Sequence, residues 1–173
     1  MTTPKRSGLP VLRRAPGLDH STSDEAVLDG LSKRIIEQLQ EDGRRSYAAI
    51  GRAIGLSEAA VRQRVERLRE QEVIKITAVA DAKSVGFHRE AMVAVKVDGD
   101  VRLVAEKLAA VPETDYVVIC AGSFDLLVEL ICVDDEHLLQ LVNGAIRTIP
   151  GVSATETFVY LKVAKETYTW GTR

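Results

Sequence analysis

Apolar residues recur at helical spacing in three segments between residues 24 and 72, which predicts three helices. Asp29 can cap the first, because its side chain can accept a hydrogen bond from the first helical turn. Asp42 and Gly43 end this helix shortly after residue 39. Its buried stripe has four members, which are Leu31, Ile35, Ile36 and Leu39.

The second and third helices are expected to be joined by a tight turn. Ser46 can cap the second helix, and Gly55 can end it, because glycine takes a left-handed backbone without penalty. Ser57 can cap the third helix in the same way. The apolar stripes are Ala49, Ile50, Ala53 and Ile54 on the second helix, and Val61, Val65 and Leu68 on the third. Two helices joined in this way predict a helix-turn-helix.

After Glu70 the pattern changes from helical to extended. The predicted elements are a linking strand over residues 73–79, strands over 91–98, 115–121 (buried), 125–133 and 152–164, and helices over 100–110 and 135–148. From residue 91 onward the order is strand-helix-strand-strand-helix-strand. This order predicts a ferredoxin-like βαββαβ domain, in which both helices cover one face of a four-stranded antiparallel sheet.

The predicted fold class is therefore α+β, with a winged-helix-like helix-turn-helix domain linked to a ferredoxin-like domain. One face of such a sheet is left uncovered, and an uncovered apolar face usually binds a partner. We therefore expect a homodimer formed through the sheets, which assembles into higher oligomers. The expected segments are a disordered basic arm (1–23), the helix-turn-helix (24–72), a linking strand and loop (73–90), the assembly and effector domain (91–164) and a tail (165–173) that contains Tyr168 and Trp170.

Charge is unevenly distributed along the 173 residues, although the net charge is only −2. Residues 1–23 carry +3 and residues 79–173 carry −5. Residues 43–70 hold seven Arg and three Glu, a surplus of four positive charges that suits DNA phosphates. This distribution favours a DNA-facing N-terminal half and a C-terminal half that faces away from DNA.

A DNA-binding surface is predicted on the polar side of the helix-turn-helix. Its alternative is a solvated helical hairpin, but the small residues Ala59 and Ala60 favour close approach of the third helix to the major groove. The predicted DNA-binding residues are Arg44, Arg45, Ser46, Ser57, Ala60, Arg62, Gln63, Arg64 and Arg67. Arg62 and Gln63 are the candidates for base edges, and Arg44 for a phosphate.

The remaining composition points away from other classes of protein. Cys120 and Cys132 lie in apolar runs and are expected to be reduced core thiols. No apolar run approaches the length of a membrane helix, no signal peptide is evident, and a cytoplasmic protein is expected. No catalytic residue, metal site or cofactor motif stands out, so no enzymatic activity is expected.

Ordered motifs make residues 27–163 resemble the Lrp/AsnC (feast/famine) family of transcription factors. The motifs are Leu28-Asp29, Ile35-Ile36, Leu39-Gln40-Glu41-Asp42-Gly43-Arg44, Gly55-Leu56-Ser57, Ala60-Val61, Arg64-Val65-Glu66-Arg67-Leu68, Val73-Ile74, Gly86, Pro112-Glu113, Gly122-Ser123-Phe124-Asp125-Leu126, Ile149-Pro150-Gly151-Val152 and Thr157. The resemblance implies a DNA-binding regulator, dimers that assemble further, and an amino acid as effector. The chain departs from the family pattern at Ser32, usually acidic, at Ile50-Gly51, usually Leu-Ala, and at Glu72, usually Gly. Glu72 is expected to make the third helix end less sharply.

The resemblance also suggests an effector site between dimers. The predicted residues are Gly122, Ser123, Phe124, Asp125, Thr155 and Thr157. Loop N–H groups and Ser123 would hold a carboxylate and Asp125 an ammonium, although a bare hairpin turn is the alternative. Two other functions stay open at this point. They are a ligand-sensing regulatory subunit of an amino-acid-metabolising enzyme, and an architectural DNA binder without effector.

Overall fold

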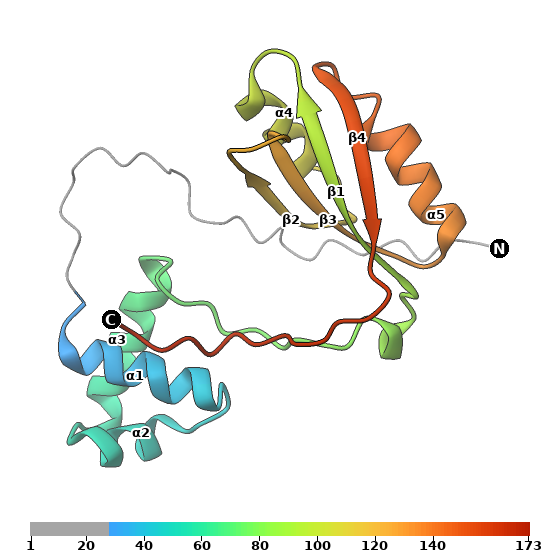
Figure 1. Ribbon diagram of the computed structural model, residues 1–173. Coiled ribbons are helices and arrows are strands. Elements are labelled where there is room, and N and C mark those ends of the chain that lie inside the picture. Colours follow the sequence, from blue (N-terminus) through green and yellow to red (C-terminus); the bar gives the residue numbers. More distant parts are fainter. Residues whose placement is uncertain (1–27) are drawn as a thin grey trace. The chain divides into compact units, whose positions relative to one another are not determined.

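The computed structural model describes residues 28–173, so the predicted basic arm lies outside the described part. Contacts group the described chain into two units (Figure 1). The helical unit contains residues 28–79 together with Lys165–Arg173, and the sheet unit is Ala80–Ala164. No helix within residues 28–173 is long and apolar enough to cross a membrane.

The helical unit consists of α1 (Gly30–Glu41), α2 (Tyr47–Ile54) and α3 (Glu58–Glu70), as the periodicity predicts. All three predicted caps are formed: Asp29 accepts from Ser32 N at 2.7 Å, and Ser46 and Ser57 accept from Ala49 N and Ala60 N at 3.2 Å. Gly55 takes the left-handed conformation that ends α2, with φ 78°. These local hydrogen bonds explain why the three helices begin and end where they do.

The helix-turn-helix is packed around a small core. Its five buried members are Ile35, Ile50, Ile54, Val61 and Val65. Gly51 lets α2 approach the turn closely, because a Cβ built there would lie 2.4 Å from Leu56 O. An alanine, as in the usual family pattern, would require this backbone to shift.

Helix α3 ends sharply, so the expectation drawn from Glu72 is wrong. Glu72 takes a left-handed backbone with φ 55°, and Val73 N donates to Leu68 O at 2.9 Å. This 6→1 bond is that of a Schellman motif, which satisfies one of the last carbonyls of the helix. A non-glycine residue in this conformation stores strain of about 1–2 kcal/mol.

The linking strand predicted over residues 73–79 is wrong for the single chain. These residues have no strand assignment, and no ladder pairs them with another segment of the described chain. Apolar alternation can predict an extended conformation, but a strand requires a neighbour for its backbone groups.

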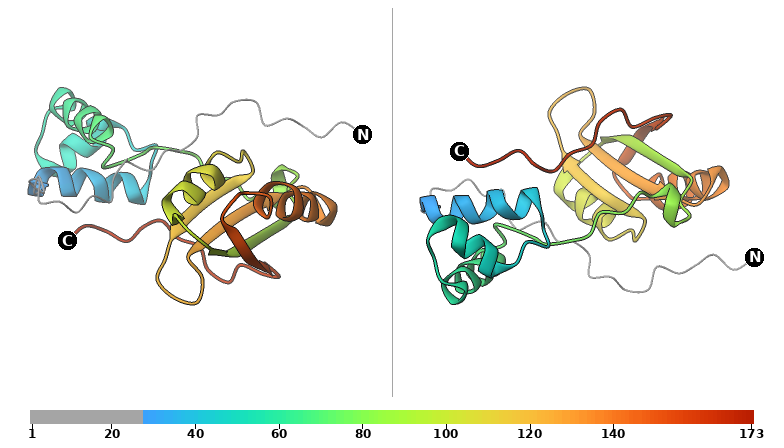
Figure 2. Two further views of the ribbon diagram at one scale, coloured as in Figure 1. Left: turned by 90° about the horizontal axis from the view of Figure 1, so that it is seen from above. Right: turned by 90° about the horizontal axis from the view of Figure 1, so that it is seen from below.

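The sheet unit has the predicted βαββαβ order after a short 3₁₀ turn, η1 (Lys83–Val85). Its elements are β1 (Arg89–Val97), α4 (Val101–Ala109), β2 (Thr114–Ile119), β3 (Leu126–Cys132), α5 (Asp135–Gln140), the π-helical turn η2 (Leu141–Ile146) and β4 (Val152–Val159). The antiparallel sheet has the strand order β2-β3-β1-β4. Figure 2 shows α4 and α5 on the same side of it.

The sheet buries one face under these helices. Val93 of β1 pairs with Val128 of β3, and Val95 pairs with Leu126. The core also contains Val104 from α4. Thirteen buried residues form this core, against five in the helical unit. The larger core follows from two central strands that point every second side chain toward the helices.

Three predicted details of the sheet unit are wrong. β2 is half-exposed because it is an edge strand, whereas a buried strand was expected. β4 ends at Val159 instead of residue 164, and the helix predicted over residues 135–148 changes to a π-helical turn after Gln140. Of the two thiols, Cys132 is buried but Cys120 is only partly buried, and neither forms a disulfide.

Candidate nucleic-acid interface and effector loop

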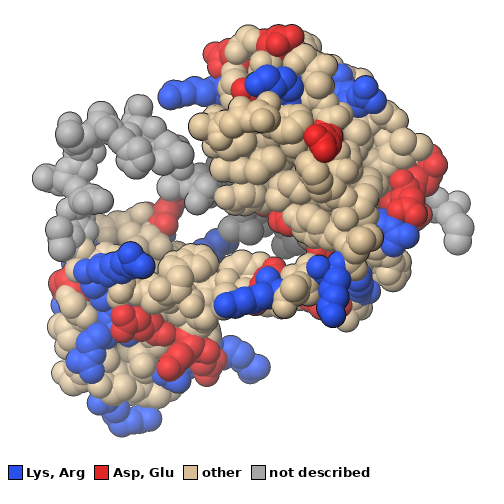
Figure 3. All heavy atoms as spheres, in the orientation of Figure 1, with Lys and Arg blue, Asp and Glu red and all other residues tan. Residues whose placement is uncertain are grey.

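Helix α3 has a buried apolar side and an exposed polar side. Val61, Val65 and Leu68 are buried against the other two helices. Arg62, Gln63 and Arg67 are exposed, as the prediction of a DNA-facing side requires. Figure 3 shows basic and acidic side chains interspersed over the visible face of the helical unit, so the basic surplus is not one uninterrupted patch.

Arg62 lies at a hollow of about 430 Å³ formed by the starts of α2 and α3. Its guanidinium bonds Glu58, one turn earlier, at 2.9 Å and lies 5.2 Å from the centre of the Tyr47 ring. This is cation–π geometry, and both contacts are at the surface, where such pairs are weak enough to be exchanged for a ligand. Tyr47 was not among the predicted residues, because its only signal in the sequence is its place directly after Ser46.

The other predicted DNA-binding residues near the starts of α2 and α3 differ in how free they are. Arg44 is exposed. Arg45 is half-buried and bonds Glu41 at 2.8 Å and Gln38 at 2.5 Å. Ser46 and Ser57 use their oxygens as caps, and Ala60 is partly buried near the start of α3. A capping hydroxyl keeps its own hydrogen, so it can still donate to a phosphate.

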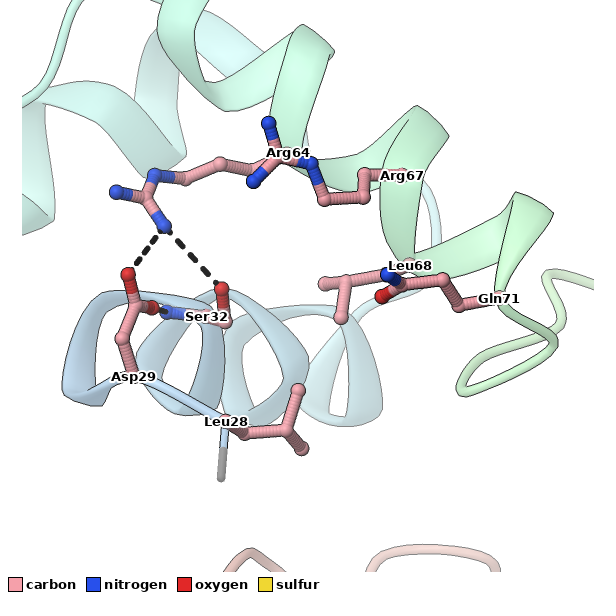
Figure 4. A pocket seen from close by; sticks show the side chains of 7 residues that line it. All are labelled: Leu28, Asp29, Ser32, Arg64, Arg67, Leu68 and Gln71. Carbon is pink, nitrogen blue, oxygen red and sulfur yellow. Dashed lines mark hydrogen bonds and ion pairs between the residues drawn. The ribbon is translucent and has the colours of Figure 1, made fainter. Parts of the chain in front are cut away.

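Arg64 differs from its neighbours on α3. Its Nη1 donates to Asp29 Oδ2 at 2.6 Å and to Ser32 Oγ at 3.3 Å, so the side chain lies against α1 (Figure 4). Only 29% of the side chain is exposed. The structure therefore places this predicted DNA-binding residue inside the helical unit, whereas Arg67 stays exposed at the rim of the same small hollow.

The predicted effector loop is the turn between β2 and β3. Gly122 and Ser123 are exposed and Phe124 is half-buried. Two backbone bonds close the turn and tie it to β1, from Cys120 N to Asp125 O at 2.9 Å and from Asp125 N to Val95 O at 3.0 Å. The loop is thus a surface turn whose two ends are held by backbone hydrogen bonds.

The Asp125 carboxylate is already bonded within the sheet unit. It accepts from Val97 N at 2.9 Å and from Lys96 Nζ at 3.3 Å. The hydrogen bond from Val97 N–H and then that from Lys96 lower the pKa of this carboxyl below its usual range. Asp125 is therefore charged at neutral pH, and its unused lone pairs remain for a ligand cation.

The two predicted threonines lie on β4, beyond β1. Thr155 pairs with Val95, which pairs with Leu126 on its other side, so Thr155 and the effector loop share one end of the sheet. Two strand spacings of about 4.8 Å separate them. Thr157 pairs with Val93 and lies two residues further from this end.

The sheet face opposite the helices carries exposed aromatic side chains among a few charged ones, which include Glu129 and Glu156. In Figure 3 the visible side of the sheet unit has a broad area without charged side chains, with charges mainly at its margins. Phe158 and Tyr116 are 48% and 42% exposed there. The half-buried Glu129 of β3 accepts from Tyr160 at 2.8 Å, and burial together with this bond raises the pKa of the tyrosine.

A helix-turn-helix followed by a βαββαβ unit is the architecture of a transcriptional regulator with a separate assembly domain. Two family models match the chain in this order: "AsnC-type helix-turn-helix domain" over residues 28–69 and "PF0864 C-terminal dimeric alpha+beta barrel domain" over residues 87–173. The chain therefore belongs to the Lrp/AsnC family of helix-turn-helix transcriptional regulators. The matched family model and relatives describe transcriptional regulators and not enzymes.

Known proteins agree with this assignment. The HTH-type transcriptional regulator FL11 of Pyrococcus furiosus is 37% identical over 82% of this chain and 94% of its own, and FL11 of Pyrococcus horikoshii is 37% identical over 81% and 93%. The E. coli AsnC structure matches with a TM-score of 0.71, 21% identity and coverage of 82% and 97%. The complex of Neisseria meningitidis regulator NMB0573 with L-Met matches with a TM-score of 0.72, 23% identity and coverage of 82% and 95%. These structural likenesses show the fold.

Proposed function

We propose that this regulator binds double-stranded DNA with sequence preference through the exposed N-terminal half of α3. The observation that carries the proposal is the arrangement around Arg62, which is exposed beside Gln63 and held only by surface contacts to Glu58 and Tyr47. A guanidinium in this state can exchange a weak ion pair for two bonds to a guanine edge, and an amide can pair with adenine.

Arg44 and Arg67 act on the DNA backbone in this proposal. Both are exposed on the helical unit, and phosphate contacts set the position of the protein without reading sequence. Arg45 is already paired with Glu41, so its contribution is smaller. Ser46 and Ser57 add hydroxyl donors at the starts of α2 and α3, where helix dipoles also favour an anion.

Assembly follows from the uncovered sheet face. The apolar area that includes Phe158 suits a second copy of the same sheet, and the matched family model is described as dimeric. A two-fold dimer would present two α3 helices about 34 Å apart, or a multiple of it, to half-sites related by a palindrome.

The effector in this proposal is an amino acid held at the loop of residues 122–125. Ser123 and the loop N–H groups supply donors for its carboxylate, and Asp125 supplies a negative charge for its ammonium. The fold-level neighbour in complex with L-Met supports this chemistry by analogy. Ligand binding between dimers would shift assembly and DNA affinity together, by the reciprocity of coupled sites.

A selection experiment tests the DNA-binding proposal. Duplexes recovered from a random-sequence library by the wild-type protein are titrated against the wild type, Arg62→Ala, Gln63→Ala and Arg44→Ala. We expect each of the first two changes to cost about 1–3 kcal/mol on the preferred duplex and to relax its preference. Arg44→Ala should weaken all duplexes alike. Unchanged preference in the Arg62→Ala, Gln63→Ala double variant would refute this use of α3.

Calorimetric titration with the common amino acids tests the effector site. The Asp125 carboxylate accepts a hydrogen bond from Val97 N of β1. Asp125→Ala would therefore remove both this bond and the negative charge. Asp125→Asn keeps an acceptor for that N–H and removes the charge, and Ser123→Ala is a milder change in the exposed turn. We expect loss of the amino-acid response in Asp125→Asn with the sheet intact by circular dichroism. Wild-type affinity in both variants would place the effector elsewhere.

A further inference from the structure

Arg64 lies in the middle of α3 but does not extend toward solvent as Arg62 and Arg67 do. Its guanidinium crosses to the first turn of α1, where it bonds a residue 35 positions earlier in the chain. Figure 4 shows the side chain pointing at Asp29 and Ser32 across a hollow of about 190 Å³.

Asp29 accepts two hydrogen bonds at this point. Its Oδ1 accepts from Ser32 N at 2.7 Å as the cap of α1, while Oδ2 accepts from Arg64 at 2.6 Å. The Ser32 hydroxyl, which is buried, lies 3.3 Å from the same Arg64 nitrogen. The pKa of Asp29 falls to about 2, first through Ser32 N–H and the Ser32 hydroxyl, and then through Arg64. Asp29 is therefore an anion at any physiological pH.

We propose that Arg64 is a positioning residue, which ties α3 to the start of α1 through Asp29 and Ser32 and thereby sets the orientation in which α3 meets DNA. The inference rests on the proposed function, since it concerns how the proposed DNA-reading helix is held. It replaces the prediction that Arg64 contacts DNA itself.

Two features of the helical unit give this contact its importance. Helix α3 contributes Val61 and Val65 to the buried cluster of the described helical unit, and this cluster has five members. A small apolar contact resists separation of two helices better than it resists rotation, because apolar burial is non-directional. A charge-assisted bond from a guanidinium is directional, and here one nitrogen, Nη1, bonds both Asp29 and Ser32.

A titration of matched variants tests the proposal. The probes are a duplex recovered from a random library by the wild type and a scrambled duplex of the same length, at several salt concentrations. The variants are Arg64→Gln, Asp29→Asn, their combination, Arg64→Lys, and Arg67→Gln for comparison. Asp29→Asn is informative because asparagine is also a good N-cap, so the change removes the charge but keeps the cap.

We expect Arg64→Gln and Asp29→Asn each to lower affinity for the preferred duplex about tenfold. An effect of this size lies within the range of interaction energies between contacting residues. Affinity for the scrambled duplex should stay within about twofold, with an unchanged salt slope, because no phosphate contact is lost. The double variant should be no worse than either single one. Arg64→Lys, whose ammonium can still reach Asp29, should recover most of the preference. Arg67→Gln should weaken both duplexes and reduce the salt slope by about one.

A direct DNA contact by Arg64 predicts the opposite pattern. Arg64→Gln would then reduce the salt slope by about one, and Asp29→Asn would raise affinity for both duplexes by releasing a cation. Either result overturns the proposal, as does an unchanged preference in a folded Asp29→Asn protein. A wild type that selects no duplex refutes the proposed function and this inference together. A selective wild type with insensitive variants refutes this inference alone.

Discussion

The helical unit and the sheet unit differ in the size of the apolar core that stabilises each of them. The sheet unit has thirteen buried core residues and three antiparallel ladders, whereas the helical unit has a buried cluster of five. The helical unit adds directional bonds between its helices, from Arg64 to Asp29 and from Arg34 to Ala53 O at 3.0 Å. A unit with little apolar core depends more on each remaining interaction, so small changes should act more strongly in the helical unit.

The largest difference between the two units should follow the same kind of truncation in each core. Ile50 and Leu130 are both fully buried, and Ile50→Ala and Leu130→Ala should each cost about 2–5 kcal/mol. That cost is a larger share of the helical unit's stability. Hydrogen exchange in the full chain should show α2 amides exchanging freely in Ile50→Ala, while β1 amides remain protected in Leu130→Ala. Equal loss of protection in both units would show that they unfold together.

Gly51→Ala tests the close approach of α2 to its turn. The new Cβ would meet Leu56 O at 2.4 Å, and that oxygen belongs to a backbone that cannot rotate away. We expect a cost of about 1–3 kcal/mol, the usual range for an added group in a packed site. Thermal unfolding followed by circular dichroism measures it. Ala53 was predicted on the apolar stripe of α2, but its side chain is exposed, so Ala53→Gly is a control that changes helix propensity without the clash.

Glu72→Gly should act in the other direction. Glycine removes the penalty of the left-handed conformation but widens the unfolded ensemble, so a net gain of up to about 1 kcal/mol is expected. Slower exchange of the last amides of α3 would report it. Glu72→Ala keeps the left-handed penalty and should show no gain. Equal stability of the two variants would mean that Glu72 is not strained.

The smallest effect expected is a pH dependence from the Asp29 carboxyl, whose pKa is lowered first by its bonds from Ser32 and then by the bond from Arg64. The pKa of Asp29 is about 2 in the folded chain and 3.8 without these contacts. Its contribution to the free energy of unfolding is therefore complete above about pH 4. It is lost as the pH falls from about 4 to 2, because the unfolded state then binds the proton first. Asp29→Asn should remove this part of the acid dependence. Identical acid unfolding of wild type and Asp29→Asn would contradict the assignment.

Local pattern predicted much of this protein. Periodicity placed all three helices of the helix-turn-helix, and Asp29, Ser46 and Ser57 were identified as caps, because a cap depends on residues two or three positions away. The βαββαβ order also followed from alternation and turn residues. Arg62 and Gln63 were placed on the exposed side of α3 because they lie off its apolar stripe.

Tertiary structure decided where the polar side chains point. Arg64 also lies off the apolar stripe, and only the packing of α1 against α3 brings Asp29 within reach of it. In the same way, Asp125 meets Val97 N only because β1 and β3 are neighbours, and β2 is half-exposed because it is at the edge of the sheet. The sequence pattern predicted most of the elements, since helix and strand formation depend largely on near neighbours. Partners that lie 28 or 35 residues apart depend on how the elements pack, which no local pattern contains.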